Sequence, residues 1–384
     1  MRYREPFTLY LRKLPSGKKI WYYQTYDKNN NRTSGFSTGK KSKTAAKAYC
    51  FDLMKKDLLI PDKISRINFN QYSENWWIWD ECEYLNYVRK RKTISQSYAN
   101  TARVMMDKHI LPYFGKKHLK DITKYEIEKW LDSFSLKGLS NATANLGLAF
   151  LKIMFKEAVR RELLINDPSI SIMPLKTNSI QRGVLTQDEV SSLFDPENKK
   201  EIWTNDIFYY GNILSACTGM RLGEILAVRG EVLKDDHIFV NKQYTKRFGL
   251  TDVKSHKPRN VIIPEQLMSI LKNYSEQNKN GYIFSLDVGK LPVHADTMRR
   301  SLFRALKKIK IDDEQRRERN ICFHSWRHYL NTTLRSNNIT DGKLRALVGH
   351  SSSKMTEHYT HFSTDDFEDI KEIQNKIIPF EKVG

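Results

Sequence analysis

The stretch 324–361 reads HSWRHYLNTTLRSNNITDGKLRALVGHSSSKMTEHYTH, and it carries more chemistry than any other part of the chain. It opens with a His-x-x-Arg string at 324–327, and Tyr359 stands nine residues after the histidine of a later Gly-His pair, His350. Five of the chain's ten histidines lie here. There is no His-Glu-x-x-His string and no third ligand pattern beside them, so we expect no metal site.

Two further strings stand upstream of this stretch. The first, TGMRLGE at 218–224, lies at the start of a predicted helix and contains Arg221 and Glu224. The second, VKSHKPR at 253–259, lies between two predicted strands and contains Lys254.

The order of the four strings resembles that of the tyrosine recombinases, the phage-type integrase family, whose pattern is Arg, Lys, His-x-x-Arg, Gly-His and Tyr. The match covers roughly residues 185–362. Each string alone is a weak signal, whereas the ordered set is specific. Val348 and Trp326 stand where the family often has leucine. Both replacements are apolar and put little in doubt.

The resemblance implies a nucleophile and a phosphate clamp. Tyr359 would attack the DNA backbone and leave a 3′-phosphotyrosine and a free 5′-hydroxyl. Because an unperturbed tyrosine has a pKa of about 10, it needs activation by its neighbours. Arg221 and Arg327 would bind the non-bridging oxygens of the scissile phosphate, since a guanidinium stays protonated and meets phosphate through paired hydrogen bonds.

The resemblance also implies roles in proton transfer. Lys254 would be the general acid that protonates the departing 5′ oxygen, with Lys257 as the alternative. His324 would accept the tyrosine proton or hydrogen-bond the phosphate, and His350 would donate to a phosphate oxygen. Glu224, one helical turn beyond the first arginine, would orient catalytic groups. This chemistry keeps the bond energy in the protein-DNA link, so we expect no cofactor.

The composition agrees with a polyanionic partner. Lys and Arg number 65 against 44 Asp and Glu, which gives a net charge of +21 and favours nucleic acid over a membrane surface. The four cysteines lie far apart without a Cys-x-x-Cys pair and are expected to be reduced. No signal peptide or membrane-spanning run is recognised, so we expect a cytoplasmic protein.

Three domains are predicted, in an α+β multidomain fold. Residues 1–66 carry 16 Lys/Arg and 5 Asp/Glu, a local net of +11, and form a small three-stranded sheet packed on a helix. Residues 67–175 are helical. Residues 176–384 form a mainly helical catalytic domain with a small antiparallel sheet and a C-terminal tail. The first two domains resemble the arm-binding and core-binding domains of many integrases.

Local patterns set the boundaries of the first domain. Strands are expected at Phe7–Leu14, Ile20–Tyr26 and Thr33–Thr38, separated by turn residues. A helix capped by Ser42 follows, and its buried face is predicted to contain Ala46, Tyr49, Cys50, Leu53 and Met54.

Further patterns divide the rest of the chain. The three tryptophans at 76, 77 and 79 are expected in the core, within the first helix of the second domain. The last helix of that domain is expected near Ala144–Leu164, ending before Pro168. TQDE at 186–189 reads as a capping box that opens a helix. The tail beyond Thr364 has helical spacing that fits docking either on its own chain or on a neighbouring protomer.

The predicted function is a site-specific recombinase that integrates and excises a mobile element or prophage. Its partners would be double-stranded DNA at specific sites, a homotetramer on two such sites, and an excision or DNA-bending accessory protein. The alternatives are a chromosome-dimer-resolving recombinase, a non-catalytic DNA-binding regulator of the same architecture, a type IB topoisomerase and a metal-dependent nuclease.

Overall fold

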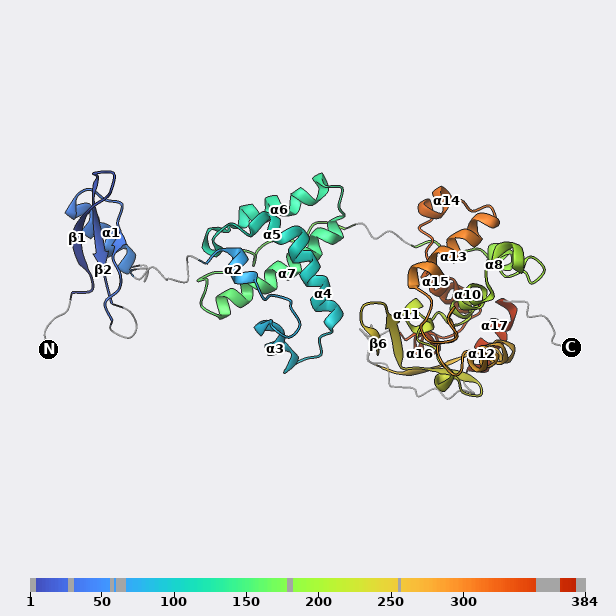
Figure 1. Cartoon of the computed structure of the whole chain (residues 1–384). Coiled ribbons are helices and arrows are strands. Elements are labelled where there is room, and N and C mark those ends of the chain that lie inside the picture. The colour runs from blue at the N-terminus through green and yellow to red at the C-terminus, as the bar shows by residue number, and fades with distance from the viewer. Residues whose placement is uncertain are drawn as a thin grey trace. The chain divides into compact units, whose positions relative to one another are not determined.

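The computed structural model of the chain describes residues 5–26, 31–55, 59, 67–177, 182–254, 257–349 and 367–377. The chain divides into two compact units, Met1–Asn178 and Ser179–Gly384. Its buried apolar residues form three separate clusters, one for the N-terminal sheet, one for the helices that follow and one for the C-terminal unit. The combination of helices with small antiparallel sheets, visible in Figure 1, confirms the predicted α+β class.

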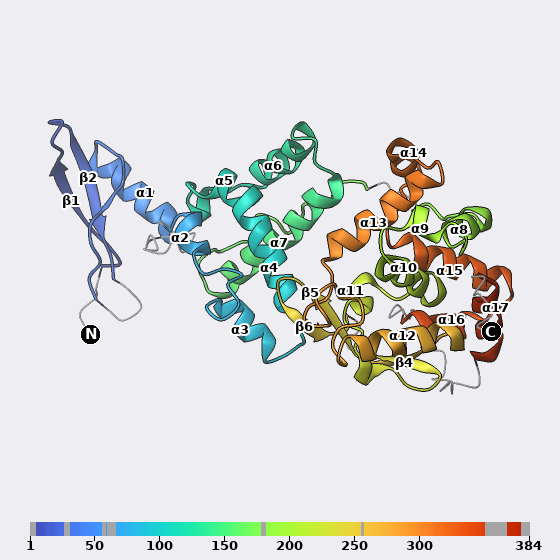
Figure 2. The ribbon, with the colours of Figure 1, turned by 45° about the vertical axis from the view of Figure 1, so that its right-hand side comes forward.

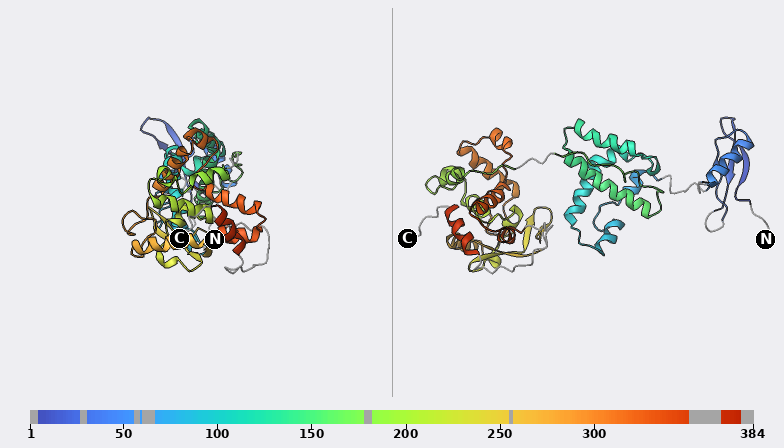
Figure 3. Two further views of the ribbon diagram at one scale, coloured as in Figure 1. Left: turned by 90° about the vertical axis from the view of Figure 1, so that its right-hand side faces the viewer. Right: turned by 180° about the vertical axis from the view of Figure 1, so that it is seen from behind.

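The N-terminal part is the predicted sheet with its helix. Strands β1 (Thr8–Lys13), β2 (Lys19–Gln24) and β3 (Phe36–Ser37) pair antiparallel in that order. Helix α1 (Lys43–Lys55) lies on one face of the sheet (Figure 3). The Ser42 hydroxyl accepts a hydrogen bond from the backbone N–H of Ala45, as the predicted cap requires.

The buried stripe of α1 is narrower than predicted. Ala46 and Cys50 are fully buried, and Tyr49 and Leu53 are partly buried against the same cluster. Met54 is 40% exposed, so its assignment to the buried face was wrong.

The helical part has six α-helices among its described residues, joined by short turns. They are α2 (Phe69–Ser73), α3 (Glu83–Arg89), α4 (Gln96–Met105), α5 (Leu111–Phe114), α6 (Lys124–Leu136) and α7 (Asn141–Arg160), with a π-turn at Met106–Ile110 and a 3₁₀ turn at Leu119–Asp121. Trp76 and Trp77 are buried in the core, and Trp79 is partly buried beneath the guanidinium of Arg89.

The placement of these tryptophans in a helix was wrong. Helix α2 ends at Ser73, and the chain then turns, with Trp77 in the left-handed region at φ 64°. The turn lets Trp76 and Trp77 pack on each other with ring centroids 5.4 Å apart.

The C-terminal boundary of α7 also differs from the prediction. The helix ends at Arg160, and Glu162 adopts a left-handed conformation at φ 58°. Arg160 and Arg161 both donate hydrogen bonds to the buried carboxylate of Glu157. This cluster ends the helix about two turns before Pro168, so the proline does not set the boundary.

The C-terminal unit contains the remaining elements. Its helices are α8 (Gln187–Leu193), α9 (Lys199–Ile202), α10 (Asp206–Thr218), α11 (Leu222–Ile225), α12 (Glu265–Gln277), α13 (Ala295–Lys308), α14 (Asp313–Glu318), α15 (Ser325–Ser336), α16 (Asp341–Val348) and α17 (Glu368–Ile377), with a 3₁₀ turn at Gly230–Val232. Its strands are β4 (His237–Val240), β5 (Lys242–Thr245), β6 (Gly249–Asp252) and β7 (Arg259–Ile262), paired as β4-β7 and β5-β6.

Helix α10 forms the centre of this unit. Most of its residues are buried, and it packs along α15 (Figure 2). The predicted capping box that opens α8 is present, because Thr186 and Glu189 each bond the other's backbone N–H. The described helices include none that is long and apolar enough to cross a membrane.

Helix α17 of the tail packs on its own chain. Phe367, Ile370, Ile373 and Ile377 belong to the hydrophobic cluster of the C-terminal unit. The side-chain amide of Gln374 donates to the carbonyls of Cys217 and Ile262, at 2.9 and 3.2 Å. Of the two predicted arrangements of the tail, the structure therefore contains the one in cis.

Candidate active site

Arg221 is presented by a tight turn between two helices. Helix α10 ends at Thr218, and Gly219 adopts a left-handed conformation at φ 62°. A Cβ at Gly219 would lie 3.2 to 3.5 Å from atoms of Val348, Leu330 and Arg327. Only glycine meets both the backbone and the space requirement at this position without strain. The turn places Arg221 at the N-cap of α11.

Glu224 holds this turn in place from inside the protein. Its side chain is only 1% exposed and accepts hydrogen bonds from the backbone N–H and the guanidinium of Arg221, both at 3.0 Å. Burial alone would raise the pKa of this carboxyl, but Arg259 and Arg221 hold the pKa below its ordinary value. Glu224 is therefore a buried carboxylate that holds Arg221 in place.

Arg259, the first residue of β7, is the second partner of Glu224. Its guanidinium donates to both carboxylate oxygens, at 3.2 and 2.7 Å, and its Nε donates to the carbonyl of Leu347 at 2.9 Å. Its side chain is 7% exposed. It also lies against Gly349, where an added Cβ would be 3.2 Å from the guanidinium. Arg259 thus connects α11 to the end of α16.

Sequence reasoning missed Arg259. It was noted only as part of the basic string 253–259. The available signal was its place at the start of a strand whose neighbours, Val261 and Ile262, are apolar. A charged residue at the start of a buried strand, such as Arg259, needs a buried partner of opposite charge.

Arg327 is the most deeply buried of the predicted cationic site residues, at 2% exposure. It lies on α15 and donates to the carbonyl of Gly219 at 2.9 Å and to that of Val348. Burial lowers the pKa of Arg327 to about 10, and the nearby Arg221 and Arg259 add to the effect. It remains a cation at neutral pH. It also joins the turn of Arg221 to the end of α16.

His324 stands at the start of α15, half-buried beside these arginines. Its ring packs edge-on against that of His328, with centroids 5.2 Å apart. Burial lowers the pKa of His324 to about 4, followed by the charges of Arg182, His328, Arg327 and Arg221. The imidazole is therefore neutral at neutral pH and able to accept a proton.

Lys254 and Lys257 lie in the connection between β6 and β7, as predicted. Both are exposed. The β5-β6 hairpin before them packs on α11, where a Cβ at Gly223 would be 3.2 Å from the carbonyl oxygen of Tyr244. The connection therefore starts from a hairpin that contacts the helix capped by Arg221. The structure does not favour one lysine over the other.

Two predicted site residues, His350 and Tyr359, lie outside the described residues. The described chain reaches Gly349, which ends α16 in a left-handed conformation at φ 68°. Val348, the apolar replacement noted in the sequence, is fully buried.

Trp326, the other replacement, is a core residue of the same helix as Arg327. It is fully buried and stacks on Phe194 with centroids 5.2 Å apart. Its indole N–H donates to the side-chain oxygen of Asn212 on α10, at 2.9 Å. This hydrogen bond ties α15 to α10 beside the arginine cluster.

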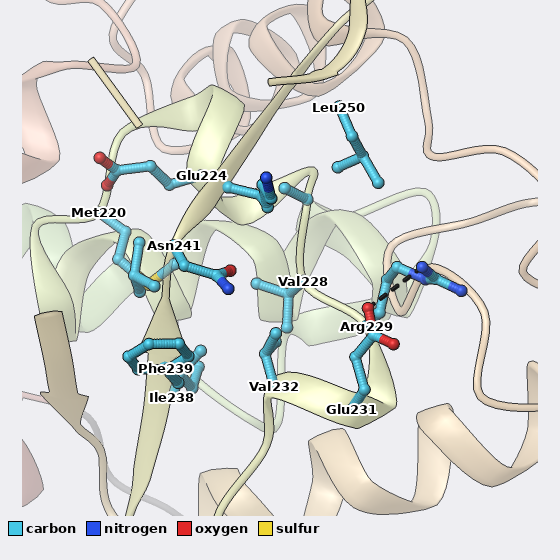
Figure 4. A pocket seen from close by; sticks show the side chains of 13 residues that line it. Met220, Glu224, Val228, Arg229, Glu231, Val232, Ile238, Phe239, Asn241 and Leu250 are labelled. Atoms are coloured by element: carbon cyan, nitrogen blue, oxygen red, sulfur yellow. Dashed lines mark hydrogen bonds and ion pairs between the residues drawn. The ribbon is translucent and has the colours of Figure 1, made fainter. Parts of the chain in front are cut away.

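A pocket of about 260 Å³ lies on the other side of Glu224. Figure 4 shows Glu224 and Met220 at one side of it and the Arg229–Glu231 ion pair at the other. Most of its lining is apolar, including Val228, Val232, Ile238 and Leu250. The pocket shares Glu224 with the arginine cluster, but its mainly apolar lining does not suit a phosphate.

The cluster has the chemistry of an anion site with a proton acceptor. Arg221 and Arg327 are brought together through Gly219, and both raise the positive potential at His324. Fixed cations beside a neutral imidazole suit a phosphate that gains negative charge during a reaction. Within the described part of the chain, no three His, Cys, Asp or Glu side chains gather as metal ligands.

Sequence families match two parts of the chain. The pattern described as "Phage integrase family" matches residues 183–365, and "Phage integrase, N-terminal SAM-like domain" matches residues 83–135. A tyrosine recombinase of Thermosipho africanus is 24% identical over 302 residues, which are 76% of this chain and 97% of the relative. The prophage ps2 probable integrase of Lactococcus lactis is 24% identical over 404 residues, 96% of this chain and 100% of the relative.

Solved structures share the fold. The Tn1549 transposon integrase in complex with a circular intermediate DNA aligns with a TM-score of 0.58 at 18% identity, over 75% of this chain and 97% of that one. A lambda integrase dimer bound to a COC′ core site aligns with a TM-score of 0.55 at 17% identity, over 92% and 97%. The ordered motifs, the fold and the matched families agree, and the chain belongs to the phage integrase family of tyrosine recombinases, enzymes that break and rejoin DNA.

Proposed function

We propose that the chain is the integrase of a mobile element or prophage, which recombines specific DNA sites through a 3′-phosphotyrosine. The observation that carries this proposal is the convergence of two motifs far apart in the sequence: Arg221 of the string 218–224 lies beside His324 and Arg327 of the string 324–327. An accessory sheet domain upstream suits a mobile-element integrase better than a recombinase that resolves chromosome dimers.

Arg221 and Arg327 bind the non-bridging oxygens of the scissile phosphate. Both arginines are held by buried contacts before any DNA arrives, which limits the reorganisation needed in the transition state. Glu224 positions Arg221 through two hydrogen bonds. The pentacoordinate phosphorus then develops its negative charge against fixed cations.

Tyr359 attacks the phosphorus, and His324 accepts the phenolic proton. The low pKa of His324 keeps its ring unprotonated before the attack. As the new bond from the tyrosine oxygen to phosphorus forms, the bond to the 5′ oxygen breaks, and Lys254 supplies the proton that this oxygen needs. His350 donates a hydrogen bond to a phosphate oxygen. The reverse attack by a 5′-hydroxyl rejoins the strand.

The domains are assigned by the same resemblance. Residues 1–66 form an arm-type DNA-binding domain, residues 67–175 a core-binding domain and residues 176–384 the catalytic domain. Relatives in the solved structures are dimers on a core site and a tetramer on a Holliday junction. We propose that four copies of this chain act on two DNA sites in the cytoplasm, with an accessory protein that bends DNA or directs excision.

A suicide substrate tests the proposal. A duplex with a nick beside the cleavage position loses its short strand after cleavage and traps the covalent intermediate. The wild type is expected to give a DNA adduct that survives a denaturing gel, in the presence of EDTA, and Tyr359→Phe is expected to give none. An adduct from the phenylalanine variant, or none from the wild type on its cognate site, contradicts the proposal.

A further inference from the structure

Arg182 lies in a short segment that is seated on the catalytic unit. The carbonyl of the nearby Val184 accepts a hydrogen bond from Arg319 at 3.2 Å, and Arg319 also forms an ion pair with Glu189 at 2.6 Å. A Cβ at Gly183 would lie 2.0 Å from the carbonyl oxygen of Arg319, so only glycine permits this close approach. The backbone beside Arg182 is therefore fixed to the end of α14.

The side chain of Arg182 extends from this segment toward the start of α15. Its guanidinium contacts the sulfur of Cys322 at 3.6 Å. The backbone N–H of Cys322 donates to the hydroxyl of Ser325 at 3.1 Å, which fixes the loop around His324. The guanidinium of Arg182 therefore contacts Cys322, which precedes the predicted proton acceptor, His324, by two residues. The hydrogen bond between Cys322 and Ser325 fixes the conformation of this loop.

Burial is the main cause of the lowered pKa of His324, and among the charged groups that lower it further Arg182 has the largest effect. The others are His328, Arg327 and Arg221. The pKa of His328 is also lowered, first by burial and then by the charges of Arg182 and Arg327. Arg221 and Arg327 already serve the phosphate clamp, and phosphate binding offsets their charge. The guanidinium of Arg182, which contacts Cys322, is not one of the groups proposed to bind the phosphate.

We infer that Arg182 is a positioning residue: its guanidinium, held against Cys322, places a positive charge beside His324 and His328 and, together with their burial, favours the unprotonated imidazole that accepts the tyrosine proton. The inference rests on the proposed function for the identity of that proton. A cation beside an imidazole disfavours its protonated form. Bound DNA acts in the opposite direction, because a phosphate favours the imidazolium. Arg182 offsets this effect and widens the pH range in which His324 is a base.

The pH profile of cleavage separates this role from simple phosphate binding. Arg182→Gln removes the charge from an exposed side chain that donates a hydrogen bond to the sulfur of Cys322. The acidic limb of the rate of adduct formation is expected to move to higher pH, with a several-fold loss of rate near pH 5.5 and none near pH 8. A residue that only bound DNA would instead lower the rate or the affinity at every pH.

Two control variants isolate the charge and its position. Arg182→Lys keeps a cation and is expected to restore the wild-type profile. Arg335→Gln removes a charge from an exposed position on α15, where Arg335 pairs with Asp341 at 3.1 Å, and is expected to leave the profile unchanged. DNA affinity, measured by fluorescence anisotropy at both pH values, is expected to be the same in all four proteins.

A second readout does not depend on cleavage. In the full-length chain labelled with ¹³C at histidine Cε1, the signals of His324 and His328 are assigned by the variants His324→Gln and His328→Gln. Arg182→Gln is expected to raise the titration midpoints of both. Unmoved midpoints, or a uniform loss of cleavage at every pH, overturn the inference. A wild type that forms no adduct at any pH overturns the proposed function instead, while the midpoints still decide the role of Arg182.

Discussion

Arg259 and Glu224 form a buried ion pair in which the guanidinium donates to both carboxylate oxygens, at 3.2 and 2.7 Å. The pair lies between the turn that presents Arg221 and the backbone that leads to Gly349. Removing one member of a buried pair leaves the other charge without compensation, whereas replacing both is tolerated far better. The position of Arg221 therefore depends on Arg259, to which the sequence analysis assigned no role.

Arg259→Gln is expected to lower the free energy of unfolding of the C-terminal unit by about 3 to 5 kcal/mol, because it leaves Glu224 buried and unpaired. Urea unfolding followed by tryptophan fluorescence measures the change. The double variant Arg259→Gln/Glu224→Gln is expected to recover a large part of the stability. It is also expected to cleave DNA slowly, because Arg221 loses the carboxylate that positions it. Equal destabilisation by the single and double variants would show that the pair is not coupled.

Gly349→Ala is expected to destabilise the chain by more than the roughly 1 kcal/mol that a left-handed residue with a side chain costs. The added methyl group would contact the guanidinium of Arg259 at 3.2 Å and displace it. Gly249→Ala is the matched control, since Gly249 has φ +64° in the same unit with open space around it. Thermal unfolding of both variants tests the difference, and equal losses contradict the role given to Arg259.

Trp326→Leu, which installs the residue often found in the family, is expected to cost about 3 kcal/mol through the cavity that it leaves beside Phe194. Trp326→Phe isolates the hydrogen bond to Asn212, whose loss costs about 1 to 3 kcal/mol when the partner stays buried. Asn212→Leu in the Trp326→Leu background is expected to restore part of the stability. If it lowers the stability further, the hydrogen bond is not the reason for the pairing of these residues.

The stability of the C-terminal unit is expected to fall in mild acid. His324 has a folded-state pKa of about 4, below its ordinary value of about 6.5 in the unfolded chain. The unfolded state therefore binds protons more readily, and the contribution of this histidine is complete above about pH 6.5 and is lost as the pH falls toward 4. Urea unfolding across this range measures the loss. His324→Gln is expected to reduce its slope, and an unchanged slope contradicts the assignment.

The predicted site motifs could be read from the sequence because each is a local pattern. Arg221, Glu224, His324 and Arg327 are in short strings whose order carries the information, and the structure brings these residues together at one turn. The capping box before α8 was also readable, since both of its residues act on their own backbone. Local signals of this kind do not depend on the rest of the fold.

Features set by long-range packing were not readable from the sequence. Arg259 pairs with a residue 35 positions away, and no local pattern announces that contact. Helix α7 ends where two arginines fold back on a buried Glu157, not at the proline that follows. Trp77 has a positive φ, which sequence propensity does not anticipate for a tryptophan. In each case tertiary contacts outweighed the local preference.

The most direct test of the account identifies the residue and the DNA end that are joined. The trapped adduct from a suicide substrate is digested with protease, and the DNA-linked peptide is sequenced by mass spectrometry, with the strand end located by a label at either terminus. The account predicts a peptide that carries DNA on Tyr359 through a 3′-phosphate, with a free 5′-hydroxyl on the released strand. A link to any other residue, or to a 5′-phosphate, would contradict it.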